Sequence, residues 1–139
     1  MINKKLQLNR LWEKEIFRQF VKFCFVGFAN TIIDFSVYIF VSRVLGVYFL
    51  YANILAIIVA MTFSFFLNKY WTFKNLEKKI KTQYIKFTLV NLVYFFLNNS
   101  IVFILVANFK FYDLGAKAVA IIVGLFWNFI ANRYWTFKN

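Results

Sequence analysis

Two charged residues stand inside long apolar stretches of the sequence, where charges are rare. Asp34 lies past the middle of one apolar run, and Lys117 lies about one helical turn inside another. A charge at the centre of a membrane costs roughly 2.5–3.5 kcal/mol on insertion scales, so each side chain needs a partner, a proton or water. Together they could bind and orient a phosphate-bearing ligand. They could instead form a structural ion pair, or the lysine could extend outward while the aspartate stays neutral.

Neutral hydrogen-bonding residues accompany these charges. Asn30 and Thr31 lie one turn before Asp34 and share its helical face. Asn98 lies at similar depth in another apolar run and offers an amide there. Asp34 is about 9 Å deeper than the outer end of its helix, so Lys117 can reach it if their helices are neighbours. We therefore expect a polar seam through apolar helices, with substrate-binding residues along it.

A second set of candidates stands in an octapeptide that the chain contains twice, NKYWTFKN at 68–75 and NRYWTFKN at 132–139. Cations at head-group depth meet phosphates, and indoles pack at the membrane interface. A generic aromatic belt does not explain the fixed order, so we expect a turn over the bilayer or a lipid-phosphate site. The candidate binding residues here are Asn68, Lys69, Asn132, Arg133 and, one turn earlier, Asn128; the interface residues are Trp71, Phe73, Lys86, Trp135 and Phe137.

The octapeptides end two copies of one unit. Sliding the sequence by 64 residues without a gap aligns Ser36 with Ser100, Ala56 with Ala120, and many other positions. We place the repeats at about 22–75 and 84–139. Because the charged Asp34 then aligns with the neutral Asn98, and Lys117 with a neutral asparagine, the doubled scaffold is chemically asymmetric. Such asymmetry suits an asymmetric ligand.

Composition places these units in a membrane. Hydrophobic residues make up 63% of the 139 residues and charged residues only 16%, far from the balance of a soluble domain. Spanning the hydrocarbon takes about 20 apolar residues as helix. The segments that qualify are approximately Phe23–Ser42, Tyr48–Leu67, Phe87–Asn108 and Leu114–Ala131. The predicted fold is an all-α integral membrane protein with four transmembrane helices, arranged as two tandem hairpins with parallel orientation.

The distribution of positive charge predicts the orientation. Of the 17 Lys and Arg, only Arg43, Lys110 and Lys117 lie on one side of the predicted spans, and the other 14 flank the opposite ends. By the positive-inside rule both termini and the middle loop are cytoplasmic. Residues 1–21 carry apolar side chains at three- and four-residue spacing among basic ones, which predicts an amphipathic interfacial helix rather than a cleavable signal peptide.

Several function classes are excluded on this pattern. The net charge of +12 is concentrated between spans, which is typical of membrane proteins rather than of nucleic-acid binding. The single cysteine, Cys24, cannot form an internal disulfide, and with no histidine a metal site is not expected. No nucleotide-binding loop and no pair of carboxylates inside the spans occur. We predict no catalytic residue, no cofactor and no metal.

Two stretches resemble the GtrA-like family: KFCFVGFANTIIDF at 22–35 and FFLNKYWTF at 65–73. The resemblance extends from about residue 19 to the end of the chain. It implies a small four-span protein of the bacterial cytoplasmic membrane that flips a polyprenyl-phosphate-linked monosaccharide, such as an undecaprenyl-phosphate sugar. Such sugars decorate O-antigen, teichoic acid or other envelope polysaccharides. Similar modules occur fused or coupled to polyprenyl-phosphate glycosyltransferases.

Carried over to this sequence, the resemblance selects three groups of residues. They are Gly27, Asn30, Thr31 and Asp34 in the first span; Asn68, Trp71, Thr72 and Phe73 after the second; and Lys117 with Asn132 and its Trp-Thr-Phe successor in the last. The second repeat departs from the first at Asn91 and Asn98. The expected partners are the lipid-linked sugar, the membrane, a second copy of the chain and a membrane glycosyltransferase. A non-transporting glycosyltransferase anchor is the main alternative, and a proton-coupled small multidrug exporter is another.

Overall fold

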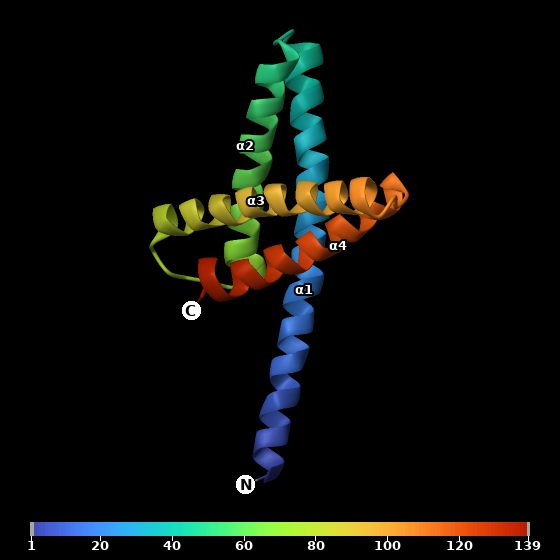
Figure 1. Ribbon diagram of the computed structural model, residues 1–139. Helices are drawn as coiled ribbons and strands as arrows, with labels where there is room; N and C mark the ends of the chain where they lie inside the picture. The colour runs from blue at the N-terminus through green and yellow to red at the C-terminus, as the bar shows by residue number, and fades with distance from the viewer. Residues whose placement is uncertain (1, 139) are drawn as a thin grey trace. The chain divides into compact units, whose positions relative to one another are not determined.

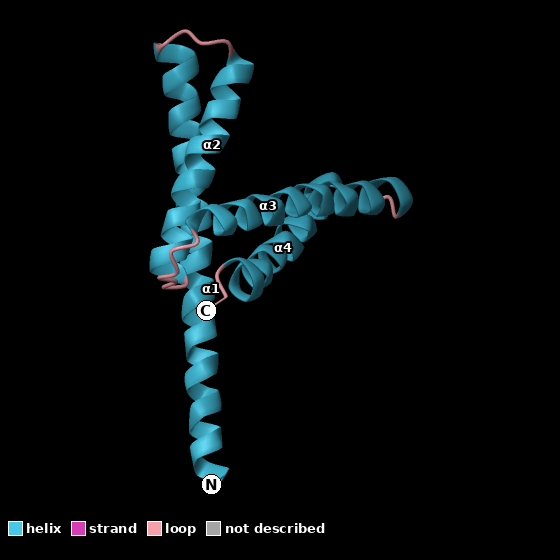
Figure 2. Cartoon of the chain, turned by 90° about the vertical axis from the view of Figure 1, so that its left-hand side faces the viewer, coloured by secondary structure: helices cyan, strands magenta, loops and turns pink. Residues whose placement is uncertain are grey.

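The computed structural model describes residues 2–138, with side chains from residue 9 onward. Within that part of the chain every regular element is a helix and no strand occurs (Figure 2). The long helices are α1 (Ile2–Ile39), α2 (Phe49–Leu67), α3 (Ile80–Phe103) and α4 (Asp113–Ala131). Each continues into a π-helical turn: η1 (Phe40–Val44), η2 (Asn68–Thr72), η3 (Ile104–Asn108) and η4 (Asn132–Thr136). The predicted class is confirmed, since four helices are long and apolar enough to cross a membrane.

The ends of α2 and α4 agree with the predicted spans, whereas α1 and α3 begin earlier than predicted, α3 at Ile80 rather than Phe87. α2 and α4 begin within one residue of the predicted starts and end at the predicted residues. α1 runs unbroken for 38 residues, so the residues of the expected interfacial helix are the first half of α1 rather than a separate element. The chain has no proline and its first glycine is Gly27, so nothing there interrupts the helix. At 1.5 Å per residue α1 is about 57 Å long, well beyond the roughly 30 Å of hydrocarbon.

The chain forms two compact units, Met1–Lys74 and Asn75–Asn139, each built on one helical hairpin. In the first hairpin α1 and α2 run side by side, and in the second α3 and α4 do (Figure 1). The first turn uses Gly46 with φ of 67°, and the equivalent residue of the second, Lys110, has φ of 54°. This left-handed conformation favours glycine and costs other residues roughly 1 kcal/mol.

Small residues line the seam of each hairpin. Those buried at four-residue intervals are Ala52, Ala56 and Ala60 in α2, and Ala116, Ala120 and Gly124 in α4. The two sets lie at positions 64 residues apart in the sequence. In a bilayer the hydrophobic effect does not drive helices together, so close approach over small residues supplies the packing. Both hairpins are thus held by the same seam.

One pair of positions differs in size between the two seams. In the second hairpin the ring of Tyr94 packs on Gly124 so closely that a methyl group on the glycine would overlap it. The equivalent residues of the first hairpin are the smaller Asn30 and the larger Ala60. The exchange compensates in volume, because the larger Tyr94 occurs with a glycine and the smaller Asn30 with an alanine.

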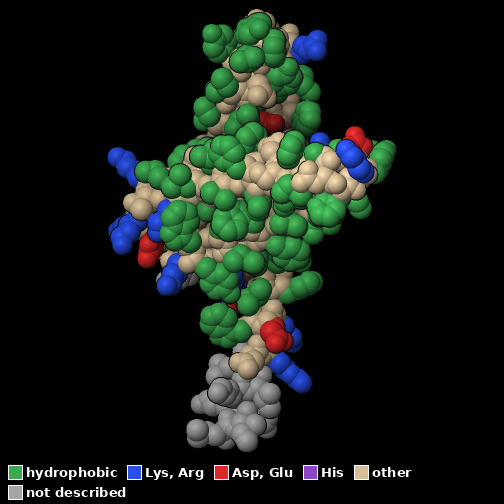
Figure 3. Space-filling view, in the orientation of Figure 1, with side chains coloured by type: hydrophobic (Ala, Val, Ile, Leu, Met, Phe, Trp, Pro, Cys, Tyr) green, Lys and Arg blue, Asp and Glu red, His purple; other side chains and the backbone are tan. Residues whose placement is uncertain are grey.

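Apolar side chains dominate the outward faces of the helices (Figure 3). Phe25, Phe28 and Phe35 of α1 are 65%, 67% and 61% exposed, and many Leu, Ile and Val along the other helices are similarly open. Soluble proteins rarely show contiguous apolar patches beyond a few hundred Å². The exposed apolar surface of these hairpins therefore belongs in lipid, and the chain is a multi-pass membrane protein.

Replacing Gly124 by alanine tests the second seam. Gly124→Ala should destabilise the protein by roughly 1–3 kcal/mol, because the Tyr94 ring must move to admit the methyl group. Thermal unfolding in detergent, followed by circular dichroism, measures the change. The double variant Tyr94→Asn with Gly124→Ala installs the pair of the first hairpin and should recover part of the loss.

The control is Gly27→Ala, since a methyl group on Gly27 meets nothing within 4 Å. It should leave the unfolding temperature unchanged or slightly raised, as alanine favours helix over glycine. Equal losses for the Gly27 and Gly124 variants would contradict the assignment of the seam.

Candidate functional site

The two octapeptides fold in the same way, as π-helical turns that end α2 and α4. The Phe73 amide donates to the Asn68 carbonyl at 2.9 Å, and the Phe137 amide donates to the Asn132 carbonyl at 2.8 Å. The asparagine side chains bond back into their helices, the first to the Ser64 hydroxyl at 3.3 Å. π-helical turns are rare and are frequent at functional sites, although here each of the four long helices ends in one. The repeated sequence therefore encodes a defined way of ending a span.

A lysine from the other helix of each hairpin caps this turn. The Lys22 amine donates to the Trp71 carbonyl at 3.3 Å and lies 4.9 Å from the centre of the Trp71 ring system. The Lys86 amine does the same to Trp135, at 3.4 Å and 5.4 Å. Each lysine thus satisfies a free carbonyl at a helix C-terminus and covers an indole. Sequence reasoning placed Lys86 and missed Lys22 as a site residue, although the 64-residue repeat aligns the two.

A pair of phenylalanine rings packs beside the lysine-capped turn in each hairpin. The rings of Phe23 and Phe73 lie 6.1 Å apart, and those of Phe87 and Phe137 also lie 6.1 Å apart. Phe73 and Phe137 are almost fully buried, so they pack the turn rather than face lipid head groups. The tryptophans of the predicted interface set are partly open, Trp71 at 42% and Trp135 at 47%. Within that set, these indoles are therefore better placed than the phenylalanines for the interface.

Polar atoms without partners gather at these turns. The Asn68 and Asn132 side-chain oxygens are buried with no hydrogen-bond partner, and so are the hydroxyls of Thr72 and Thr136. The same is true of the Asn128 side-chain oxygen, one turn before Asn132. Buried polar atoms are normally paired, and leaving one unpaired costs about 1–3 kcal/mol. These atoms accordingly offer hydrogen-bonding capacity to a ligand or to water.

The cations of the octapeptides lie beside the unpartnered groups in sequence and stack on the next residue. The Lys69 amine is 5.5 Å from the Tyr70 ring, and the Arg133 guanidinium is 5.5 Å from the Tyr134 ring. Lys69 is fully buried and Arg133 is half-buried. Anionic groups such as phosphate favour cations, and the half-buried Arg133 is the more accessible of the two.

The structure separates the candidate binding residues in the middle of the first span into two groups. The side-chain oxygen of Asn30 and one carboxylate oxygen of Asp34 are buried with no hydrogen-bond partner. Thr31 is different, because it is exposed and its hydroxyl donates to the Gly27 carbonyl at 3.2 Å. Asn30 and Asp34 thus form the polar face, and Thr31 is satisfied by its own helix. The expected Asp34–Lys117 contact would join the two hairpins, each described by itself, and stays a prediction.

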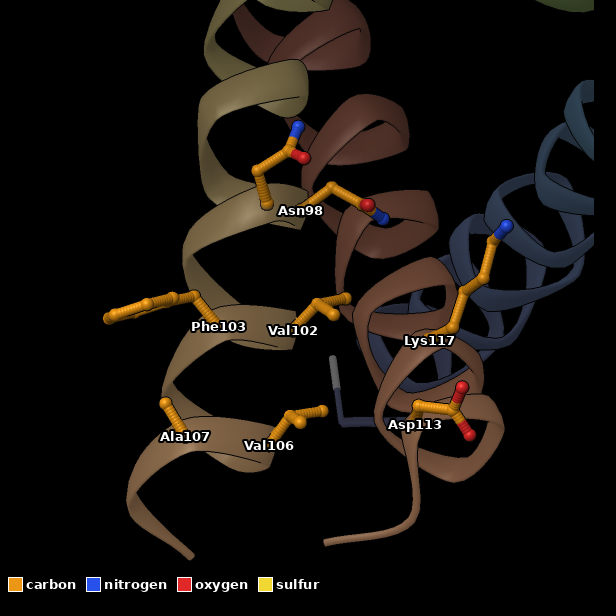
Figure 4. A pocket seen from close by; sticks show the side chains of 8 residues that line it. Asn98, Val102, Phe103, Val106, Ala107, Asp113 and Lys117 are labelled. Carbon is orange, nitrogen blue, oxygen red and sulfur yellow. The ribbon is translucent and has the colours of Figure 1, made fainter. Parts of the chain in front are cut away.

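The second hairpin brings Asn98 and Lys117 to one pocket of about 580 Å³ (Figure 4). It opens between the end of α3 with η3 and the start of α4, away from the octapeptide turn. The other lining residues are Asn99, Val102, Phe103, Val106, Ala107 and Asp113. One ammonium, one carboxylate and two amides therefore line an open groove with an apolar wall, in which Lys117 and Asp113 are exposed. Such a groove can bind a ligand with an anionic group, hydroxyls and an apolar part.

Sequence reasoning missed Asp113 because it stands at the helix start, outside the predicted span. Its spacing of four residues from Lys117 was the available signal, since side chains at that spacing share a helical face. Among the described residues no cluster of three or more Asp, Glu, Cys and His could hold a metal ion.

Comparison with known proteins covers both hairpins. The family described as GtrA/DPMS, transmembrane domain, matches residues 22–137. The "Uncharacterized membrane protein YngA" of Bacillus subtilis (strain 168) is 32% identical over 131 residues, which is 91% of this chain and 84% of that protein. The matched region begins at the first capping lysine, Lys22, and ends at Phe137 of the second octapeptide.

Removing a capping lysine tests whether it stabilises the octapeptide turn. Lys22→Met and Lys86→Met should each lower the free energy of unfolding by about 1 kcal/mol, because each exposes a carbonyl and an indole. Intrinsic tryptophan fluorescence should change with the variants, and thermal unfolding in detergent measures the stability. Lys138→Met, at an exposed lysine, is the control. If all three variants unfold at the same temperature, the lysines do not cap the turns.

Proposed function

The chain belongs to the GtrA/DPMS transmembrane-domain family, and from that membership we propose that it flips a polyprenyl-phosphate-linked monosaccharide across the bacterial cytoplasmic membrane. An undecaprenyl-phosphate sugar is the proposed substrate, used outside the cell to decorate teichoic acid, O-antigen or another envelope polysaccharide. Both termini lie in the cytoplasm in this proposal, as the distribution of Lys and Arg predicts.

The observation that carries the proposal is the pair of unpartnered polar side chains inside α1. Buried oxygens of Asn30 and Asp34 lack hydrogen-bond partners in a helix whose other faces carry apolar side chains. In hydrocarbon such groups are costly unless water or a ligand reaches them. A sugar supplies hydroxyl donors to these acceptors and in turn needs a path that avoids lipid. The cost of the unpaired oxygens and the cost of placing the sugar in lipid both fall when the head group moves along this helix.

The cationic and amide groups at the octapeptide turns fit the other end of the path. Lys69 and Arg133, with the unpartnered Asn68 and Asn132 oxygens, can hold a phosphate and its water near the cytoplasmic leaflet. The polyprenyl chain stays in lipid against the exposed apolar faces. Four helices enclose little space, so we propose that two or more copies of the chain assemble around the path, with exposed small residues such as Gly27 at their contacts.

One alternative function is supported by the family description itself, which names DPMS beside GtrA. In that alternative the chain anchors or regulates a polyprenyl-phosphate glycosyltransferase and transports nothing. A scaffold needs its helix surfaces and not its buried polar groups. Charge-neutral substitutions at Asp34 and Lys117 therefore separate the two functions.

Leaflet exchange in liposomes tests the proposed function. The purified chain is reconstituted with a fluorescent polyprenyl-phosphate sugar, and a membrane-impermeant quencher reports how fast the probe reaches the outer leaflet. The chain should make inner-leaflet probe accessible to the quencher, whereas in protein-free liposomes the inner-leaflet probe, about half of the total, stays protected. Asp34→Asn and Lys117→Gln should each slow exchange at least about tenfold, which corresponds to about 1.4 kcal/mol.

The matched controls are substitutions of polar or charged residues outside the proposed path and pocket. Ser36→Ala alters an exposed polar residue of α1, and Lys110→Gln alters an exposed lysine outside the pocket. Both should exchange lipid at the rate of the unaltered chain. If the unaltered chain exchanges no lipid, the flippase proposal is contradicted and the anchor function remains. Exchange that is unchanged in the Asp34 and Lys117 variants would contradict the polar path.

A further inference from the structure

Several residues that line the pocket of the second hairpin differ from the residues 64 positions earlier in the first hairpin, although the two hairpins repeat each other. Its apolar wall contains Val102, and the residue 64 positions earlier is Tyr38. A tyrosine ring is much larger than an isopropyl group, so the first repeat carries bulk where the second carries space. The small side chain at 102 is therefore a specific change that opens this region.

The polar residues of the pocket are also particular to the second hairpin. Lys117 replaces a neutral asparagine, Asn53, and Asp113 replaces Phe49 of the first repeat. Seam residues such as Ala116 are kept as alanine in both copies. The second hairpin thus preserves its packing and acquires a cation, a carboxylate and space at one place. Packing requirements alone do not call for that combination.

The polar groups of the pocket are available to a ligand. Among the described residues, neither the Asn98 amide nor the Lys117 amine has a hydrogen-bond or ion-pair partner, while the Asn99 amide donates to the Phe95 carbonyl at 2.7 Å. One Asp113 oxygen accepts from the Leu114 amide at 2.8 Å. Figure 4 shows Val102 and Val106 on the side of α3 that faces α4, and Lys117 and Asp113 on α4 with their charged ends directed away from α3.

We propose that this pocket binds the sugar-phosphate head group of the lipid, with Lys117 on the phosphate and Asn98 and Asp113 on sugar hydroxyls. Phosphate favours an ammonium, and amide and carboxylate groups pair with hydroxyls. Phe103 at the rim is 68% exposed, so the prenyl chain can leave the pocket along an apolar edge into lipid. The proposal rests on the proposed function and deepens it by assigning the head group to one hairpin.

The orientation predicted by the positive charges adds a direction. The pocket lies at the ends of α3 and α4 opposite the octapeptide turn, which is the outer side by that prediction. The head group would then occupy this pocket just before release. A site on the second hairpin only gives the doubled fold one exit rather than two equivalent ones.

Equilibrium binding to the full chain in lipid nanodiscs tests the pocket without requiring transport. The radiolabelled probes are polyprenyl-phospho-glucose and polyprenyl-phospho-N-acetylglucosamine, and the competitors are polyprenyl phosphate, glucose 1-phosphate and phosphatidylglycerol. We expect at least one sugar lipid to bind at least about tenfold more tightly than polyprenyl phosphate. Val102→Tyr, which installs the residue of the first hairpin, should weaken that binding at least about tenfold, and Lys117→Gln should do so independently.

The matched control is Val93→Tyr, the same substitution at a 46% exposed residue of α3 outside the pocket. It should bind the sugar lipid as the unaltered chain does. The pocket assignment is overturned if Val102→Tyr and Lys117→Gln bind normally, or if Val93→Tyr weakens binding as much as they do. The assignment to a sugar-bearing lipid is overturned if phosphatidylglycerol or polyprenyl phosphate competes as well as the sugar lipid, or if neither sugar lipid binds.

The two hypotheses fail in different ways. If the unaltered chain exchanges the lipid in liposomes and Val102→Tyr exchanges it equally fast, the flippase stands and the pocket assignment falls. If the unaltered chain exchanges nothing but binds the sugar lipid through Val102 and Lys117, the pocket stands as a lipid-recognition site and the flippase falls.

Discussion

Hydrocarbon offers no water to hydrogen-bond a polar group, and this constraint governs the whole chain. Helices satisfy it for the backbone, and within each hairpin the small residues of the seam provide close packing without a hydrophobic driving force. The carbonyls left free at the ends of α2 and α4 meet a lysine from the facing helix. Unpartnered oxygens, such as one carboxylate oxygen of Asp34, are exceptions that cost free energy. Polar groups kept in a membrane at such a cost point to a function.

The repeat separates what holds the fold from what recognises a ligand. The seam, the capping lysines and the octapeptide turns occur in both hairpins at positions 64 residues apart. The positions that differ include those of the polar path and the pocket, such as Asp34 against Asn98 and Tyr38 against Val102. A repeated hairpin with one modified copy can keep the same packing inside each copy and still present a single recognition surface.

The sequence predicted the four spans and the bounds of α2 and α4, because hydropathy over about 20 residues is a strong signal. It did not predict that α1 and α3 begin well before their apolar segments. It also predicted that Asn98 and Lys117 are functional candidates, and the structure brings them to one pocket. The pocket itself was not predictable from periodicity, because it depends on the volume of single side chains such as Val102. The π-helical turns were missed for a related reason, since their five-residue bonding differs from α-helix by one residue per turn.

The unbroken α1 shows the limit of amphipathic patterns. Apolar residues at three- and four-residue spacing predicted the helix that the structure shows over residues 2–21, but the pattern carries no information on where one helix ends and the next begins without glycine or proline. The contact of Tyr94 with Gly124 was likewise invisible in sequence, because it is decided by the facing helix.

The central claim is that the polar face of α1 and the pocket of the second hairpin are reached by water, not lipid. Its most direct test is the rate of maleimide labelling of single cysteines in a Cys24→Ser background, because thiols react with maleimide as thiolates and need water to ionise. Asp34→Cys and Asn98→Cys should label many times faster than Phe28→Cys and Phe96→Cys, whose native side chains are 67% and 61% exposed on the apolar faces. Equal, slow labelling at all four positions would contradict the account.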